Sequence, residues 1–254
     1  MILHSNIIGE GKPFIILHGF LGMGDNWKTL GKQFSESNFE VHLVDQRNHG
    51  RSFHSDDFDY DVMAEDLKAY CDEKNLRNMV LMGHSMGGKT AMLFATKYPE
   101  YLKQLIVADI SPRYYPAHHE DILEGLSYLD FSKIKSRGKA EKALANYVPD
   151  TGTRLFLLKN LYWVEKGKLA LRMNLEALKA SVSEVGEALP NHSTFDKSTL
   201  FLRGDKSKYI GESDETIIHR HFPNSEIKTI ANAGHWLHAE NPDDFYDAVI
   251  EFLS

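Results

Sequence analysis

Short apolar runs alternate with longer amphipathic stretches along most of the chain. The runs are rich in β-branched and large aliphatic residues, and they occupy residues 14–19, 40–46, 78–84, 104–110, 199–204 and 226–231. Between them, apolar residues recur at the spacing of one helix face in residues 27–37, 62–74, 86–98, 213–221 and 242–253. Alternation of this kind predicts crossover units and a mostly parallel sheet flanked by helices, which is the α/β class. Asn241 followed by Pro242 is typical of a helix start.

Two segments depart from this alternation. Residues 1–17 contain two strand-like runs around a glycine-containing turn, which predicts an antiparallel hairpin at the start of the sheet. Residues 113–195 contain helical patterns and no clear strand, and they are too long for a plain connection between two strands. We therefore expect a core built from residues 1–112 and 196–254, with residues 113–195 inserted between sheet strands as a helical cap.

Composition excludes several classes of protein. Of the 254 residues, 42% are hydrophobic and 26% are charged, which is typical of a globular protein. The net charge is −7 and no basic block could neutralise a run of phosphates, so nucleic acid is not an expected partner. The single cysteine, Cys71, cannot form an internal disulfide, and no apolar stretch approaches the ~18 residues of a membrane span. These features predict a soluble, cytoplasmic protein without a transmembrane segment.

The stretch Gly83-His84-Ser85-Met86-Gly87 is the first candidate for chemistry. It follows one predicted strand directly and precedes a predicted helix, which is the context of a nucleophile elbow of the form G-x-S-x-G. Small residues must flank the serine because backbone and neighbours crowd such a turn. A glycine-rich turn with a surface serine is the alternative interpretation.

A serine nucleophile needs a base and donors for the oxyanion. His235 lies in the loop after the last predicted strand, at the edge of the sheet where Ser85 is also expected. His238, three residues further along the chain, is the competing candidate for the base. The alternative role for His235 is to cap the helix that follows it. The neighbouring pair 118–119, both histidines, is interpreted as part of a polar loop. The backbone N–H groups of Phe20 and Met86 are the predicted oxyanion donors.

Four segments carry a resemblance to a known family. HGFLG, DQRNHGRS, GHSMGGK and AGHWLHAENP occur in this order across nearly the whole chain and resemble the α/β-hydrolase superfamily. More narrowly, RNHG, the lysine of HSMGGK and GHWxHAE are similar to the YbfF-type bacterial esterases and their mitochondrial abhydrolase relatives. The resemblance implies that Ser85 is a nucleophile and His235 its base, that Phe20 and Met86 donate to the oxyanion, and that the helical segment covers the site. It implies no metal and no organic cofactor.

The acid partner of the histidine has two candidates. In most of the superfamily the acid follows the penultimate strand as G-x-x-D, but this chain has Gly204-Asp205-Lys206-Ser207, so a serine stands at that position. The esterase subgroup takes its acid from a D-I-x-P sequence, which is matched here by VADISP and Asp109. Asp109 is therefore the predicted acid, and Asp205 is the alternative. Asp45 and Arg47 are interpreted as structural, and His49 has no assigned role.

The predicted reaction is acyl transfer in two steps through a Ser-His-Asp triad and an acyl-enzyme. The resemblance implies a small-molecule substrate, a short-to-medium acyl ester, with acyl-CoA thioesters as an alternative. Three other functions stay open: a menaquinone-pathway lyase, a C–C bond hydrolase, and a non-catalytic ligand receptor. The lyase family has an arginine where this chain has Lys89, and it needs several cations for its substrate. Turnover together with covalent labelling of Ser85 would distinguish an enzyme from a receptor.

Overall fold

A seven-stranded, mostly parallel sheet organises the chain. The computed structural model describes residues 1–116 and 119–254, so His118 of the polar loop lies outside the described residues. The strand order is β1-β3-β2-β4-β5-β8-β9, and β1 alone runs antiparallel to its neighbour. The strands are β1 Ser5–Ile8, β2 Lys12–Leu17, β3 Phe39–Val44, β4 Met79–His84, β5 Leu102–Ala108, β8 Thr199–Gly204 and β9 Ser225–Ile230. The predicted α/β class is confirmed.

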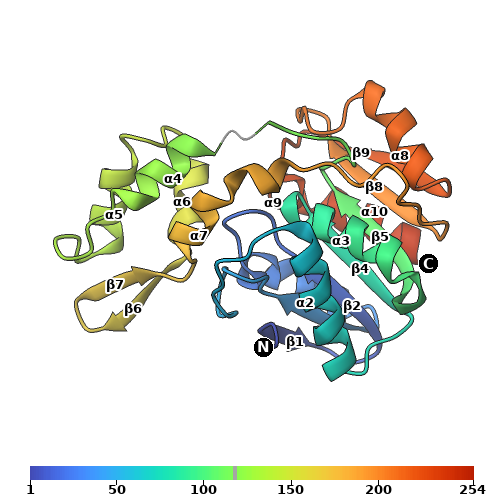
Figure 1. Ribbon diagram of the computed structural model, residues 1–254, viewed down its shortest axis with the longest axis horizontal. Helices are drawn as coiled ribbons and strands as arrows, with labels where there is room; N and C mark the ends of the chain where they lie inside the picture. The colour runs from blue at the N-terminus through green and yellow to red at the C-terminus, as the bar shows by residue number, and fades with distance from the viewer. Residues whose placement is uncertain (117–118) are drawn as a thin grey trace.

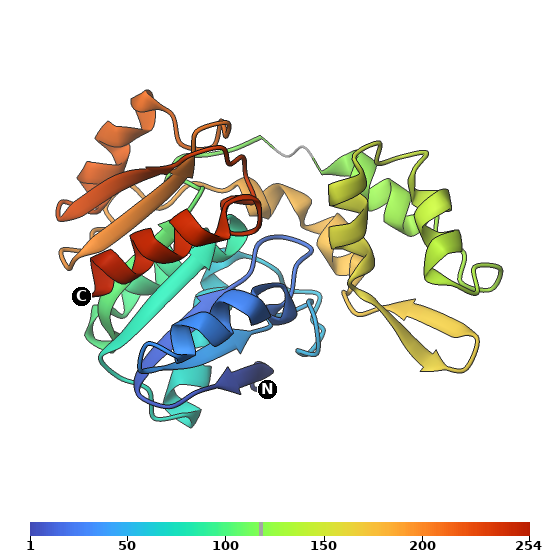
Figure 2. The same ribbon diagram turned by 180° about the vertical axis from the view of Figure 1, so that it is seen from behind.

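Helices cover both faces of the sheet because each strand alternates its side chains between two cores. Ile15 and Leu17 pack with α2 and α3, whereas Phe14 and Ile16 pack with α1 and α10. Figure 1 looks onto the face covered by α2 and α3, and Figure 2 onto the face covered by α1 and α10. The helices of the core are α1 Lys28–Ser35, α2 Tyr60–Glu73, α3 Met86–Lys97, α8 Glu215–His221, α9 Leu237–Glu240 and α10 Pro242–Leu253.

The predicted hairpin of residues 1–17 is wrong. β1 pairs with β3, from Ser5 opposite Val44 to Ile8 opposite Val41, while both edges of β2 are taken by the parallel strands β3 and β4. The burial of the two strands explains why β1 pairs with β3 and not with β2. Four consecutive residues of β2 are buried, as in an interior parallel strand, whereas β1 is only half-buried and forms an edge of the sheet.

The residues between β5 and β8 form a separate group of elements that stands to one side of the sheet (Figures 1 and 2). Its helices are α4 Glu120–Ser127, α5 Arg137–Leu144, α6 Thr151–Leu158 and α7 Leu175–Ala180. The expectation of a purely helical segment is wrong, because β6 Leu161–Glu165 and β7 Lys168–Leu171 form an antiparallel hairpin. The chain reverses at Gly167, whose φ of 84° is in the left-handed region that favours glycine. We call residues 113–195 the inserted segment.

Candidate active site

Ser85 lies on a strained turn between β4 and α3. Its φ is 53°, a conformation that non-glycine residues rarely adopt and that costs about 1–3 kcal/mol. The two flanking glycines are required by space. A Cβ on Gly83 would lie 2.1 Å from the carbonyl oxygen of Gly87, and a Cβ on Gly87 would lie 2.5 Å from that of His18. This is the geometry of a nucleophile elbow, and the surrounding structure holds the strain in place.

The side chains of His235 and Asp109 meet at the end of the sheet next to Ser85. His235 Nδ1 donates to Asp109 Oδ2 at 2.8 Å, and Asp109 is completely buried. Two further donors face the same carboxylate: the Ser207 hydroxyl reaches Oδ2 at 2.5 Å and the Gly204 N–H reaches Oδ1 at 3.2 Å. Hydrogen bonds from donors such as these offset the cost of burying a carboxylate.

The alternative acid, Asp205, is engaged elsewhere. Its two carboxylate oxygens accept the backbone N–H groups of Asn232 and Ala233, each at 2.9 Å. These hydrogen bonds, the one from Asn232 first, lower the pKa of Asp205 below its usual range. Asp205 therefore holds the loop that leads to His235, and it is Asp109 that contacts the imidazole. Ser207, at the position of the usual acid, contributes a hydroxyl to Asp109 instead.

His238, the competing base, packs differently from His235. Its ring stacks on Trp27 at 4.0 Å between centroids, with 16° between the planes. Burial lowers its pKa to about 3, so it stays neutral at physiological pH. The ring of His235 stacks instead on Tyr209, at 4.0 Å and 19°. Burial raises the pKa of the Tyr209 phenol to about 12, and the charge of Asp109 acts in the same direction.

The loop of His18 to Gly22 passes directly against the elbow. A Cβ on Gly19 would lie 2.8 Å from the His84 ring and 3.3 Å from Ser85 Cβ, so only glycine allows this approach. Phe20 is the next residue of that loop, and Met86 is the first residue of α3. The first N–H groups of a helix have no carbonyl partner within it. Both predicted oxyanion donors thus lie on segments that border Ser85.

Two buried histidines hold this loop in shape. The Leu21 N–H donates to His49 Nε2 at 3.1 Å, and the Gln46 N–H donates to His18 Nε2 at 3.0 Å. Burial lowers the pKa of His18 to about 4 and that of His49 to about 3, so both rings are neutral and can accept. His49, which sequence reasoning left unassigned, is therefore a support of the loop that carries Phe20.

Asp45 and Arg47 tie loops together as predicted, although not to each other. Asp45 accepts the N–H groups of Gly24 at 2.7 Å and Arg51 at 2.9 Å. Arg47 pairs with both carboxylate oxygens of Asp66 at 2.5 and 2.9 Å. Neither side chain lines the cavities at Ser85, which fits a structural role.

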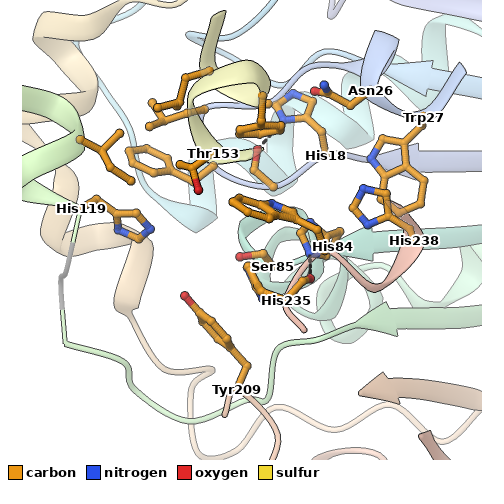
Figure 3. A pocket seen from close by; sticks show the side chains of 18 residues that line it. His18, Asn26, Trp27, His84, Ser85, His119, Thr153, Tyr209, His235 and His238 are labelled. Carbon is orange, nitrogen blue, oxygen red and sulfur yellow. Dashed lines mark hydrogen bonds between the residues drawn. The ribbon is translucent and has the colours of Figure 1, made fainter. Parts of the chain in front are cut away.

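Two cavities open onto Ser85. The large chamber has a volume of about 240 Å³, and the inserted segment contributes one wall, formed by His119, Ile122, Thr153, Phe156 and Leu157. His18, Phe20, Trp27, His84, His235, Trp236 and His238 line it from the core. The small chamber has a volume of about 20 Å³ and is lined by Met86, Ile110, Tyr115, Val182 and Val185 among others. Ser85, His119 and Tyr209 line both chambers. Figure 3 shows the Tyr209 hydroxyl directed toward the open space between His119 and Ser85.

Sequence reasoning missed His119 and Tyr209. His119 was interpreted as part of a polar loop, yet its ring packs edge-on against Phe20 at 5.0 Å. The sequence signal for Tyr209 is its place two residues after the position of the usual acid. Among residues 1–116 and 119–254, no cluster of His, Cys, Asp or Glu could hold a metal ion, and no helix is long and apolar enough to cross a membrane.

Comparisons with known proteins decide the class. A family model described as the α/β hydrolase fold matches residues 12–133. An sn-1-specific diacylglycerol lipase of Mus musculus is 37% identical over 94% of this chain and 80% of its own length. The chain belongs to the α/β-hydrolase family. A solved marine microorganism esterase is 39% identical, with a TM-score of 0.96 over 99% of both chains.

The narrower resemblance is confirmed as well. Esterase YbfF of Escherichia coli (strain K12) is 29% identical, with 96% of this chain and 94% of YbfF covered. A putative esterase/lipase of Haemophilus influenzae is 37% identical over 94% of this chain and 82% of its own length. Within the α/β-hydrolase family the protein is thus an enzyme of the esterase and lipase group.

Proposed function

We propose that this α/β hydrolase cleaves short-to-medium acyl esters through an acyl-enzyme on Ser85. The observation that carries the proposal is the buried Asp109–His235 hydrogen bond of 2.8 Å beside a strained serine that lines the same cavity as His235. Asp109 accepts the Nδ1 hydrogen of His235, which leaves Nε2 as the nitrogen that takes a proton. The carboxylate also stabilises the imidazolium that then forms.

The first half of the reaction makes the acyl-enzyme. The Ser85 hydroxyl oxygen attacks the carbonyl carbon of the ester while His235 takes the hydroxyl proton. The negative charge on the carbonyl oxygen is met by the N–H groups of Phe20 and Met86. Collapse of this intermediate breaks the bond to the alcohol oxygen, which leaves with the proton that His235 held.

The second half releases the acid. A water molecule attacks the acyl carbon, and His235 takes one of its protons. The bond to Ser85 then breaks, and the proton passes back to the serine oxygen, which restores the free enzyme. In this scheme the inserted segment, residues 113–195, acts as a cap on a core formed by residues 1–112 and 196–254, because five of its residues form a wall of the large chamber.

The lining of the large chamber favours an uncharged substrate. No Lys, Arg, Asp or Glu stands among the described residues that line it. A lyase acting on a multiply charged substrate would need several cations here, so this lining argues against that alternative. Cytoplasmic location stays a prediction.

The test is hydrolysis of chromogenic esters from acetyl to lauroyl by the wild type and Ser85→Ala. We expect turnover that disappears in Ser85→Ala, together with covalent labelling of the wild type by a fluorophosphonate probe. Ser254→Ala, which changes an exposed serine at the end of the chain, is the matched control and should keep full activity. Turnover by Ser85→Ala at the wild-type rate would show that Ser85 is not the nucleophile. Labelling without turnover on esters or acyl thioesters would favour a receptor.

A further inference from the structure

Ser85 stands at the junction of two chambers of very different size. The large chamber measures about 240 Å³ and the small chamber about 20 Å³. An ester also has two parts, the acyl group and the alcohol, which must leave the reacting carbon in different directions. The question is which part occupies which chamber, since that choice sets the substrate class.

We propose that the small chamber binds the acyl group and the large chamber binds the alcohol. The enzyme would then select acetyl and similarly short acyl groups carried on much larger, apolar alcohols. This inference rests on the proposed roles of Ser85 and His235, and it narrows the substrate class of that reaction.

The position of the base decides the direction of the leaving group. The alcohol oxygen must receive its proton from His235, so it has to lie on the side of Ser85 that His235 faces. His235 lines the large chamber and is absent from the lining of the small one. The bond from the acyl carbon to the alcohol oxygen therefore breaks toward the large chamber. Water for the second step must be activated by His235 as well, and the departed alcohol leaves room for it there.

The size of the small chamber then limits the acyl group. The small chamber has about one twelfth of the volume of the large chamber, so of the two parts of an ester it suits the shorter one. The lining by Ile110, Val182 and Val185 is apolar, which suits a hydrocarbon end. We therefore expect the small chamber to bind an acetyl group more readily than a hexanoyl chain.

The walls of the small chamber are tied to one another and to the core by hydrogen bonds. The Tyr115 N–H donates to the Gly186 carbonyl at 2.8 Å, and the Tyr60 hydroxyl donates to the Val185 carbonyl at 2.7 Å. Lys89, whose side chain is buried, donates to the Glu187 carbonyl at 2.7 Å from the neighbouring helix α3. A Cβ on Gly186 would lie 1.9 Å from the Tyr115 carbonyl oxygen, so the two segments are already in close contact. These contacts hold the segments that line the chamber in place.

The experiment measures kcat/KM in two series of esters. In the first, the alcohol is p-nitrophenol and the acyl group runs from acetyl to octanoyl. In the second, the acyl group is acetyl and the alcohol is lengthened from ethyl to octyl. We expect kcat/KM to fall about 10-fold or more from acetyl to hexanoyl, and to be kept or to rise along the alcohol series.

Two variants test which chamber limits the length of the acyl group. Val182→Ala combined with Val185→Ala enlarges the small chamber, and both side chains are half-buried, so the protein should still fold. We expect this double variant to raise the hexanoyl-to-acetyl ratio about 10-fold without changing the alcohol series. Phe156→Ala, which enlarges only the large chamber, is the matched control and should change the alcohol series alone.

Three outcomes separate the possibilities. Rates that rise with acyl length, or an acyl ratio that responds to Phe156→Ala and not to the valine pair, overturn the assignment of the chambers and leave Ser85 as the nucleophile. Loss of the acetyl preference in the valine double variant supports the assignment. Absence of turnover on every ester of both series refutes the proposed function itself, and the assignment of the chambers with it.

Discussion

Acidification should destabilise this protein well above the pH at which its carboxylates titrate. Burial lowers the pKa of His18 to about 4 and the pKa values of His49 and His238 to about 3, from 6.5. In the unfolded chain the same side chains take up protons as the pH falls below 6.5, while the folded protein does not. The unfolded state is therefore the one stabilised by acid, and the folding free energy declines as the pH falls from about 6.5 toward 4.

The magnitude follows from these pKa values. At pH 5 each of the three histidines removes about 2 kcal/mol, since one unit of pKa difference corresponds to about 1.4 kcal/mol. Together they remove about 6 kcal/mol, against a total folding free energy of about 5–15 kcal/mol for an ordinary domain. For a chain of this length, that loss lowers the melting temperature by roughly 10–20 °C.

Calorimetry at pH 7, 6 and 5 at constant ionic strength measures the effect. His49→Gln is the informative variant, because glutamine can still accept from the Leu21 N–H and donate to the Arg47 carbonyl. We expect it to be less stable at pH 7 and to lose the share of the pH dependence that His49 contributes, about 2 kcal/mol between pH 7 and pH 5. His192→Gln changes an exposed histidine and should leave the slope as it is. A melting temperature that is equal at pH 7 and pH 5, or that falls only below pH 4, would refute the reasoning.

Four substitutions test the site and its support. Asp109→Asn should lower kcat on a chromogenic ester about 10⁴-fold through the wrong tautomer of His235, whereas Asp205→Asn should keep most of the activity; the reverse ranking would contradict the assignment. Ser207→Ala removes one of three donors to Asp109 and should lower kcat about 10-fold with KM unchanged, and an unchanged kcat would show that the hydroxyl is dispensable. Lys89→Met leaves three backbone carbonyls without their buried donor and should lower the free energy of unfolding by about 1–3 kcal/mol. Urea denaturation measures this change, and equal midpoints for the variant and the wild type would contradict it.

The core elements could be predicted from the sequence because their signals are local. The helix from Pro242 to Leu253 begins and ends as expected, with Asn241 accepting the Asp244 N–H at its start. The elbow at Ser85 could be predicted as well, because the strained turn tolerates only glycine at positions 83 and 87. His235 could be placed because the carboxyl ends of parallel strands meet at one edge of the sheet.

Pairing and packing between distant segments were decided by the tertiary structure. The run at residues 5–8 has the same local pattern whether it pairs with β2 or with β3, and only the burial of β2 between two parallel strands selects β3. The apolar residues at 161 and 169 also fit a helix, and the reversal at Gly167 turns them into a hairpin. In each case a short apolar run is compatible with two structures, and the partner across the chain makes the choice.

The sequence by itself determined the candidate reacting groups of this protein, and the tertiary structure decided what surrounds them. Ser85 is marked by a motif of local geometry, His235 by its place after the last strand, and Asp109 by the resemblance to the esterase subgroup. Three other features are not marked by any motif. They are the stacking of Tyr209 on His235, the support that His49 gives to the loop carrying Phe20, and the division of the site into two chambers. The first two features join segments of the core that lie far apart in the sequence, and the chambers lie where the inserted segment meets the core. The volume left between packed surfaces depends on all the side chains of both.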